Sequence, residues 1–296
     1  MQAGSLIVSV FGDAIHPRGG VVWLGCLIRL LEPLALNERL IRTAIFRLVK
    51  DEWLETQTLG RRTDYGLSRT GRARIEEASK LIYSGQLPAW DGQWRIMMTT
   101  ADMPAKMRMA LRKALYWQGF GQLNTQAFVH PSADLNQVVD TLQTEGVLST
   151  ADTLLTFMSN MTPTAATLSN QEVVQQSWDL KHLGQGYQGF IQQYRPLLSN
   201  QAAEAASDED AFLLRILLVH DFRRLLLRDP MLPSGLMPGD WPGVMARQLF
   251  NRLYAQLQLP SERHLDAQLL TANQSTPPRG AIFKKRIATM RVDSVS

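Results

Sequence analysis

Residues 37–67 read NERLIRTAIFRLVKDEWLETQTLGRRTDYGL, and this stretch sets the architecture of the N-terminal part of the chain. Its first half predicts an amphipathic helix, because apolar side chains recur on one face at about 100° per residue and Asn37 offers an N-cap oxygen to the first turn. The apolar face consists of Ile41, Ala44, Ile45 and Leu48. The second half predicts a β-hairpin, with strands at 54–59 and 63–67 and a tip formed by Gly60, Arg61 and Arg62.

The opposite face of this predicted helix is basic. It carries Arg39, Thr43, Phe46 and Lys50, flanked by Arg42 and Arg47. A helix with a buried apolar face and a basic outer face, followed by a hairpin with arginines at its tip, is typical of a winged helix-turn-helix. Such a helix fits the major groove of DNA, while the hairpin tip reaches a phosphate or the minor groove. We therefore predict seven DNA-binding residues: Arg39, Arg42, Thr43, Arg47, Lys50, Arg61 and Arg62.

These residues have different expected roles. Arginine bonds a guanine edge through two hydrogen bonds, so Arg39 and Arg42 are expected to read bases. Arg61 and Arg62 are expected to hold backbone phosphates, which set the register of the protein on DNA. Phe46 is unusual on a solvated face; we expect it to pack against the hairpin, and contact with a thymine methyl group is the alternative. A basic helix face alone is often only a solvated surface, and the arginine-tipped hairpin is what favours nucleic acid.

The charge of the chain supports this hypothesis. The net charge is only +4 over 296 residues, but the window 39–74 contains nine Lys/Arg against four Asp/Glu. A basic field concentrated in one segment attracts a polyanion and makes its binding depend on salt concentration.

The composition also excludes several classes of protein. Cys26 is the only cysteine, which excludes an intrachain disulfide and a cysteine-based zinc site. The first residues lack the charged segment and the long apolar run of a signal peptide. The most apolar segment, 211–222, is interrupted by Arg215 and is too short to span a bilayer. We therefore expect a cytoplasmic protein with no membrane partner.

The predicted fold is α+β with several domains. Helices are expected at 5–13 and 21–31 before the stretch described above and at 68–84 after it. The central part has the order β-α-β-β-α-β of a ferredoxin-like domain; its expected elements are 94–100, 104–118, a hairpin through Leu123 and Phe128-Val129, 134–145 and 153–158. Later helices are expected at 171–183, 185–198 and 210–228, and from 243 to about 258. The expected domains are 1–85 (winged helix), 92–162 (ferredoxin-like) and 168–270 (helical), with a tail of low order at 271–296.

The chain shows no catalytic apparatus. The five histidines are scattered, and no Ser-His-Asp set or Gly-x-Gly-x-x-Gly loop is present. Asp102 follows the first central strand, where a nuclease would place a metal-binding carboxylate, but it is equally suited to cap the helix at Pro104. No second carboxylate or histidine lies near it in sequence. We expect no enzyme activity, no cofactor and no metal ion.

Six short blocks resemble the PaaX family of bacterial repressors of phenylacetic acid degradation. They are RGG at 18–20, RTAIFRL at 42–48, GRR at 60–62, WDL at 178–180, HDFRRLLLRDPMLP at 220–233 and DWPG at 240–243. The resemblance covers roughly residues 5 to 270. It implies an N-terminal winged helix, a central dimerisation domain similar to Cas2, and a helical C-terminal domain. It further implies a homodimer that blocks operator DNA of aromatic-acid catabolism and is released by phenylacetyl-CoA.

An acyl-CoA presents phosphates, an adenine and an apolar group, so its site needs arginines beside aromatic side chains. Within or beside the blocks that carry the resemblance, this composition points to His220, Arg223, Arg224 and Trp241 as effector-binding residues. The alternative for each is a place in the core or on a solvated helix face. Two other functions remain open, a general DNA-binding or architectural protein and a Cas2-like metal-dependent nuclease.

Overall fold

The computed structural model describes residues 3–83, 89–100, 103–149, 154–161, 167–199, 207–283 and 286. The chain forms two compact units that differ from the three consecutive domains expected from sequence. The first unit contains residues 1–85, 187–227 and 243–296, and the second contains 86–186 and 228–242. The C-terminal segment is thus divided between the two units. No described helix is long and apolar enough to cross a membrane.

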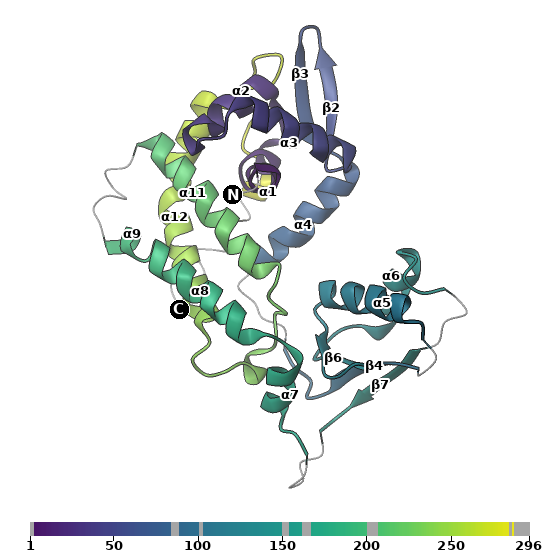
Figure 1. Cartoon of the computed structure of the whole chain (residues 1–296). Helices are drawn as coiled ribbons and strands as arrows, with labels where there is room; N and C mark the ends of the chain where they lie inside the picture. Colours follow the sequence, from purple (N-terminus) through teal and green to yellow (C-terminus); the bar gives the residue numbers. More distant parts are fainter. Residues whose placement is uncertain are drawn as a thin grey trace. The chain divides into compact units, whose positions relative to one another are not determined.

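The first unit begins with helix and a small sheet (Figure 1). Its elements are α1 (Ala3–Val10), extended by a π turn (Phe11–Ile15) and a 3-10 turn (His16–Arg18), then β1 (Val21–Trp23), α2 (Leu24–Leu31), α3 (Glu38–Lys50), β2 (Leu54–Leu59), β3 (Arg62–Leu67) and α4 (Arg69–Tyr83). The strand order is β1-β3-β2. Residues 21–23 were expected to begin a helix, and this is wrong, because Val21 to Trp23 pair with β3 in antiparallel register. Their branched and aromatic side chains suit a strand.

Helix α3 and the hairpin match the sequence prediction closely. Asn37 accepts a hydrogen bond from the backbone N–H of Leu40 at 2.8 Å, as expected of an N-cap. The four apolar side chains predicted to face inward are all buried. At the hairpin tip Gly60 has a φ of +61°, and no positive φ follows at Arg61. Glycine at the first of two loop positions is the form of a type II′ turn, which matches the twist of the strands.

The late helices of the chain complete the core of the first unit. They are α9 (Pro196–Ser199), α11 (Asp208–Leu226), and the parts of α8 (Leu180–Tyr194) and α12 (Pro242–Gln268) that begin at Tyr187 and Gly243. Phe212 and Ile216 of α11 and Leu265 of α12 pack in one cluster with Leu6 and Phe11 near the N-terminus. Helix α12 continues through Pro260 to Gln268, beyond its expected end near 258. The expected helix at 171–183 is interrupted at Trp178, which separates α7 (Asn170–Ser177) from α8.

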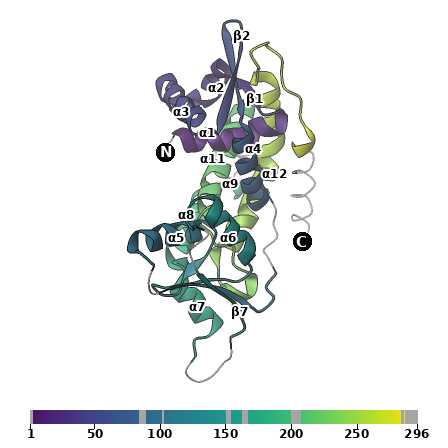
Figure 2. The same ribbon diagram turned by 90° about the vertical axis from the view of Figure 1, so that its right-hand side faces the viewer.

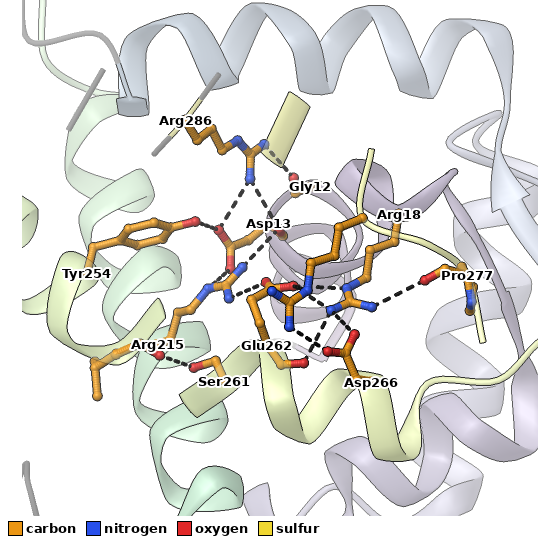
Figure 3. A network of polar contacts seen from close by, with 12 residues as sticks. Gly12, Asp13, Arg18, Arg215, Tyr254, Ser261, Glu262, Asp266, Pro277 and Arg286 are labelled. Atoms are coloured by element: carbon orange, nitrogen blue, oxygen red, sulfur yellow. Dashed lines mark hydrogen bonds and ion pairs between the residues drawn. The ribbon is translucent and has the colours of Figure 1, made fainter. Parts of the chain in front are cut away.

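A buried network of charged side chains joins the N-terminal turns to these late helices (Figure 3). Arg215 on α11 donates from Nε to Asp13 at 2.8 Å and from Nη1 to Glu262 on α12 at 2.7 Å. The hydroxyl groups of Tyr83 and Tyr254 donate to the same Asp13 carboxylate at 2.6 and 2.8 Å. The side chains of Asp13, Arg215 and Glu262 are at most 2% exposed.

Two further arginines extend the network. Arg18 donates to Glu262 at 3.0 Å, to Asp266 at 2.7 Å and to the carbonyl of Pro277 at 3.2 Å. Arg286 donates to the backbone carbonyl of Asp13 at 3.1 Å. Each charged side chain of the network thus connects its own helix or turn to an element that is distant in the sequence.

The network keeps the Asp13 carboxyl group ionised. Burial alone would raise its pKa, but Arg215, Arg286 and the hydroxyl groups of two tyrosines outweigh burial and lower the pKa below its ordinary value. A carboxylate that is stabilised in this way in the folded state contributes stability above the pKa of the unfolded chain, and this contribution is lost as the pH falls through the folded-state pKa.

The tail is better ordered in its described part than the sequence suggested. The backbone N–H of Ala272 donates to buried Asp64 at 2.7 Å, and that of Gly280 donates to the carbonyl of Pro17 at 2.8 Å. Arg286 is buried in the network. The expectation of low order is therefore wrong for residues 271–283 and 286, because polar groups of the N-terminal elements need these residues as hydrogen-bond partners.

The second unit contains the expected β-α-β-β-α-β order. Its elements are β4 (Trp94–Thr99), α5 (Ala105–Trp117), β5 (Gly121–Gln122), β6 (Ala127–His130), α6 (Leu135–Thr144) and β7 (Leu154–Ser159), with strand order β5-β6-β4-β7. Helices α5 and α6 cover one face of the sheet (Figure 2), where Met97 and Phe128 meet Leu111 and Leu142. The other face packs against α7, together with residues 232–241.

We predict that Asp13→Asn lowers the free energy of unfolding of the whole protein by about 3–5 kcal/mol, because Arg215 is left buried without one of its countercharges. Chemical denaturation followed by circular dichroism measures this loss. The control is Arg263→Gln, which breaks the exposed Arg263–Asp208 ion pair and should leave stability nearly unchanged. Equally small losses in both variants would contradict a structural role of the buried network.

Candidate nucleic-acid interface

The outer face of α3 is accessible along its whole length. Each residue predicted there to bind DNA has an exposed side chain: Arg39, Arg42, Thr43, Arg47 and Lys50. The face stays outward because the opposite face is fixed in the core. A row of cations on a rigid helix presents charges at set intervals, which is the requirement for reading a groove.

Two of these side chains have partners within the helix. Arg42 donates from Nε to Glu38 at 2.7 Å, an exposed pair one turn apart. The hydroxyl group of Thr43 donates to the carbonyl of Arg39 at 2.8 Å. The charge of Arg42 is thus partly compensated by Glu38.

Phe46 lies on the same face and is 72% exposed. It is absent from the hydrophobic core cluster of this unit. The expectation that Phe46 packs against the hairpin is therefore wrong: β2 and β3 project past the end of α3 (Figure 1), and the Phe46 side chain stays exposed.

The two arginines at the hairpin tip differ from each other. Arg61 is exposed in the turn. Arg62 is half-buried; its guanidinium lies 4.8 Å from the centre of the Trp23 ring and donates to the carbonyl of Ala272 at 3.2 Å. Arg62 is therefore held against Trp23 and Ala272 although it adjoins the turn, whereas Arg61 is exposed to solvent.

A C-terminal strap, residues 268–272, lies against β3, β1 and the start of α2. The N–H of Trp23 donates to the carbonyl of Leu270 at 3.0 Å, and the thiol of Cys26 donates to the carbonyl of Gln268 at 3.0 Å. Asp64 accepts from the strap at Ala272. Sequence reasoning missed Trp23, Asp64 and the strap. The only signal in the sequence was an acidic residue at an inward position of a strand, which needs a buried partner.

The candidate effector residues are divided between the two units. His220 is 1% exposed, and its Nδ1 lies 3.0 Å from the hydroxyl oxygen of Ser9 on α1. Arg223 donates to the same hydroxyl group at 3.3 Å. Arg224 is exposed on α11, whereas Trp241 belongs to the second unit, where it lies beside Gly184.

His220 is therefore a contact between α11 and α1. Burial lowers its pKa to about 4, so the imidazole is neutral at physiological pH and can share one hydrogen bond with Ser9. Two residues of the HDFRR block thus fix α11 to the helix that underlies α3, since α1 and α3 share the core of the first unit.

No metal centre is assembled by the residues that the structure describes. Asp102, the candidate nuclease carboxylate, lies outside them. Among the described residues no group of three or more His, Cys, Asp or Glu side chains is placed to hold a metal ion.

Three family models match successive parts of the chain. They are the PaaX-like protein model at residues 2–71, the PaaX protein central Cas2-like domain at 87–168 and the PaaX-like protein C-terminal domain at 178–267. The transcriptional repressor PaaX of Escherichia coli (strain K12) is 35% identical over 291 residues, which cover 98% of this chain and 91% of the relative. The chain belongs to the PaaX family.

The Escherichia coli relative is a transcriptional repressor, which is a regulatory role without catalysis. The prediction that this chain is a repressor is therefore confirmed at the level of the family. A repressor acts by binding DNA. The prediction of a Cas2-like central domain is also confirmed. A solved structure, the uncharacterized protein Rv0674 from Mycobacterium tuberculosis, is similar to the chain with 23% identity and a TM-score of 0.57, over 88% of this chain and 98% of that one. This similarity concerns the fold alone.

Proposed function

We propose that this PaaX-family chain represses phenylacetate catabolism by reading an operator with α3 and gripping its backbone with the β2–β3 hairpin. The single observation that carries the proposal is the exposed face of α3, where arginine, threonine and lysine side chains stand on a helix fixed by its buried side. Arg and Thr have the donor and acceptor groups that base edges in the major groove require.

In this proposal residues 1–83 act as a winged helix. Helices α1, α2 and α3 with the sheet β1-β3-β2 supply the elements of that fold. Helix α3 would be the recognition helix and the hairpin the wing, with Arg61 at its tip as the phosphate contact. The strap contacts the wing at Arg62 and Asp64.

The repressor is further proposed to act as a homodimer through the edge of the central sheet. β7 is an edge strand, and its sequence LLTFMS contains no charge. Leu155, Phe157 and Met158 are 46%, 47% and 57% exposed. Edge strands normally carry charges or proline that prevent pairing, so an uncharged apolar edge is suited to pair with a second copy about a two-fold axis.

The proposed effector is phenylacetyl-CoA, which would release the protein from DNA. Arg224 offers an exposed cation on α11, next to the two side chains that bind α11 to α1. A ligand that shifts α11 would therefore act on the core beneath α3. Coupling between two sites is usually about 1–3 kcal/mol, which gives partial release, whereas a complete switch needs about 5.5 kcal/mol.

Side chains that contact bases and side chains that contact phosphates should differ in how their loss changes sequence preference and the salt dependence of binding. Arg39→Ala or Arg42→Ala should weaken operator binding by about 1–3 kcal/mol and reduce the preference over random DNA. Arg61→Ala should weaken binding to both duplexes and lower the salt slope by about 1. Fluorescence anisotropy at several salt concentrations measures both quantities, with Arg252→Ala on α12 as the exposed control. Equal losses on operator and random DNA for all variants would instead indicate a general DNA-binding protein.

The dimer is tested by Phe157→Lys, which places a charge on the outer strand. Sedimentation analysis of the full chain should show a shift from dimer to monomer, because lysine on an edge strand opposes pairing. Met109→Lys changes an even more accessible apolar residue on α5, 69% exposed, and should leave the dimer intact. A wild-type monomer, or a dimer unaffected by Phe157→Lys, would refute this interface.

Effector release is tested by titrating the protein–operator complex with phenylacetyl-CoA, free phenylacetate and free coenzyme A. Only the thioester should release the DNA, because neither half alone presents both the phosphates and the aryl group. Arg224→Ala should raise the concentration needed for half-release, whereas Arg252→Ala should not. Release by coenzyme A alone, or none by the thioester, would contradict the assignment.

A further inference from the structure

Phe46 has the largest exposed fraction among the large apolar side chains that the structure describes. It is also central on its face of α3. At about 100° per residue, its direction lies within roughly 60° of those of Arg39, Thr43 and Lys50. An isolated exposed apolar residue is common on protein surfaces. Its position among the side chains proposed to face bases is what gives Phe46 significance.

The fold makes no use of this ring. The core side of α3 is complete with its four buried apolar residues, and Phe46 lies outside the hydrophobic core that the described residues form. A polar residue at position 46 would leave these contacts unchanged. Either a molecule that binds to the outer face of the helix gives the phenyl ring a function, or the ring has no function.

Thr43 adds a second apolar group one turn earlier. Its hydroxyl group already donates to the carbonyl of Arg39 at 2.8 Å, so the donor proton is engaged inside the helix. Because Thr43 is exposed, its γ-methyl group remains available for apolar contact. Residues three apart are neighbours on a helix surface, so Thr43 and Phe46 together form an apolar strip bordered by Arg39 and Lys50.

The major groove of DNA contains one kind of apolar group, the 5-methyl group of thymine, and Thr methyl and Phe side chains are established contacts for it. We infer that the strip of Thr43 and Phe46 recognises a 5-methylated pyrimidine in the operator and thereby determines sequence specificity. This inference rests on the proposed function, since it requires α3 to enter the major groove. The strip would add an apolar contact to a helix face whose other side chains are proposed to form hydrogen bonds and ionic contacts with DNA.

The test uses the full-length protein and a duplex selected by it from a random-sequence pool. Each thymine of the selected site is replaced, one at a time, by deoxyuridine, which removes only the methyl group. At one position in each half-site the wild type should lose roughly three- to fivefold in affinity, the value of one buried methyl group. Phe46→Ala should bind the thymine duplex more weakly and show no further loss with deoxyuridine.

Adding a methyl group to the pyrimidine at the same position should raise the affinity. At the sensitive position a C·G pair should weaken wild-type binding, and 5-methylcytosine in that pair should restore part of the loss in the wild type but not in Phe46→Ala. Met109→Ala, which removes an apolar side chain of similar exposure on α5, should respond like the wild type. Thermal unfolding should show Phe46→Ala to be as stable as the wild type, because the ring is exposed.

The outcomes separate the inference from the proposed function. A wild type that is indifferent to deoxyuridine at every thymine, or equal losses in the wild type and Phe46→Ala, overturns the methyl-reading role while operator binding stands. A random pool from which no sequence is enriched overturns the proposed operator recognition together with this inference.

Discussion

The guanidinium of Arg215 lies between the carboxylates of Asp13 and Glu262, and all three side chains are sealed from water. A charge in such a place is tolerated only when its partners are fixed, because removal of one partner leaves another charge buried alone. Asp13 follows α1, Arg215 is on α11 and Glu262 is on α12. The N-terminal elements and the late helices are therefore one folding unit, although more than a hundred residues separate them in the sequence.

This constraint gives several family blocks a structural meaning. Arg18 of the RGG block enters the same network through Glu262 and Asp266. His220 and Arg223 of the HDFRR block meet Ser9 on α1. These residues hold the C-terminal helices against the scaffold of α3. In the proposed function this contact is the route by which an effector would alter the DNA-reading face.

The parts of the fold that were predicted from sequence depend on local signals. The N-cap at Asn37 and the spacing of apolar residues in α3 both lie within one helix. Gly60 likewise predicts the hairpin turn from its own residue type, whatever the rest of the chain does. The missed parts depend on distant partners. Val21–Trp23 is a strand only because β3 lies beside it, and the partner of Asp64 is Ala272, 208 residues later. The role of Phe46 was also misjudged, because a helical pattern gives the direction of a side chain but not what covers it.

The proposed repressor function requires α3 to lie in the groove of bound DNA. Cys26, the only cysteine, is buried and its thiol pKa is raised by burial, so a DNA-cleaving iron chelate can be attached selectively to the protein carrying Thr43→Cys. The control is Met245→Cys, near the start of α12 and roughly 35 Å along that helix from the strap. We predict strand cleavage inside the bound duplex, at two symmetry-related positions, from Thr43→Cys and none from Met245→Cys. An intact duplex in a complex that Thr43→Cys still forms would contradict the account.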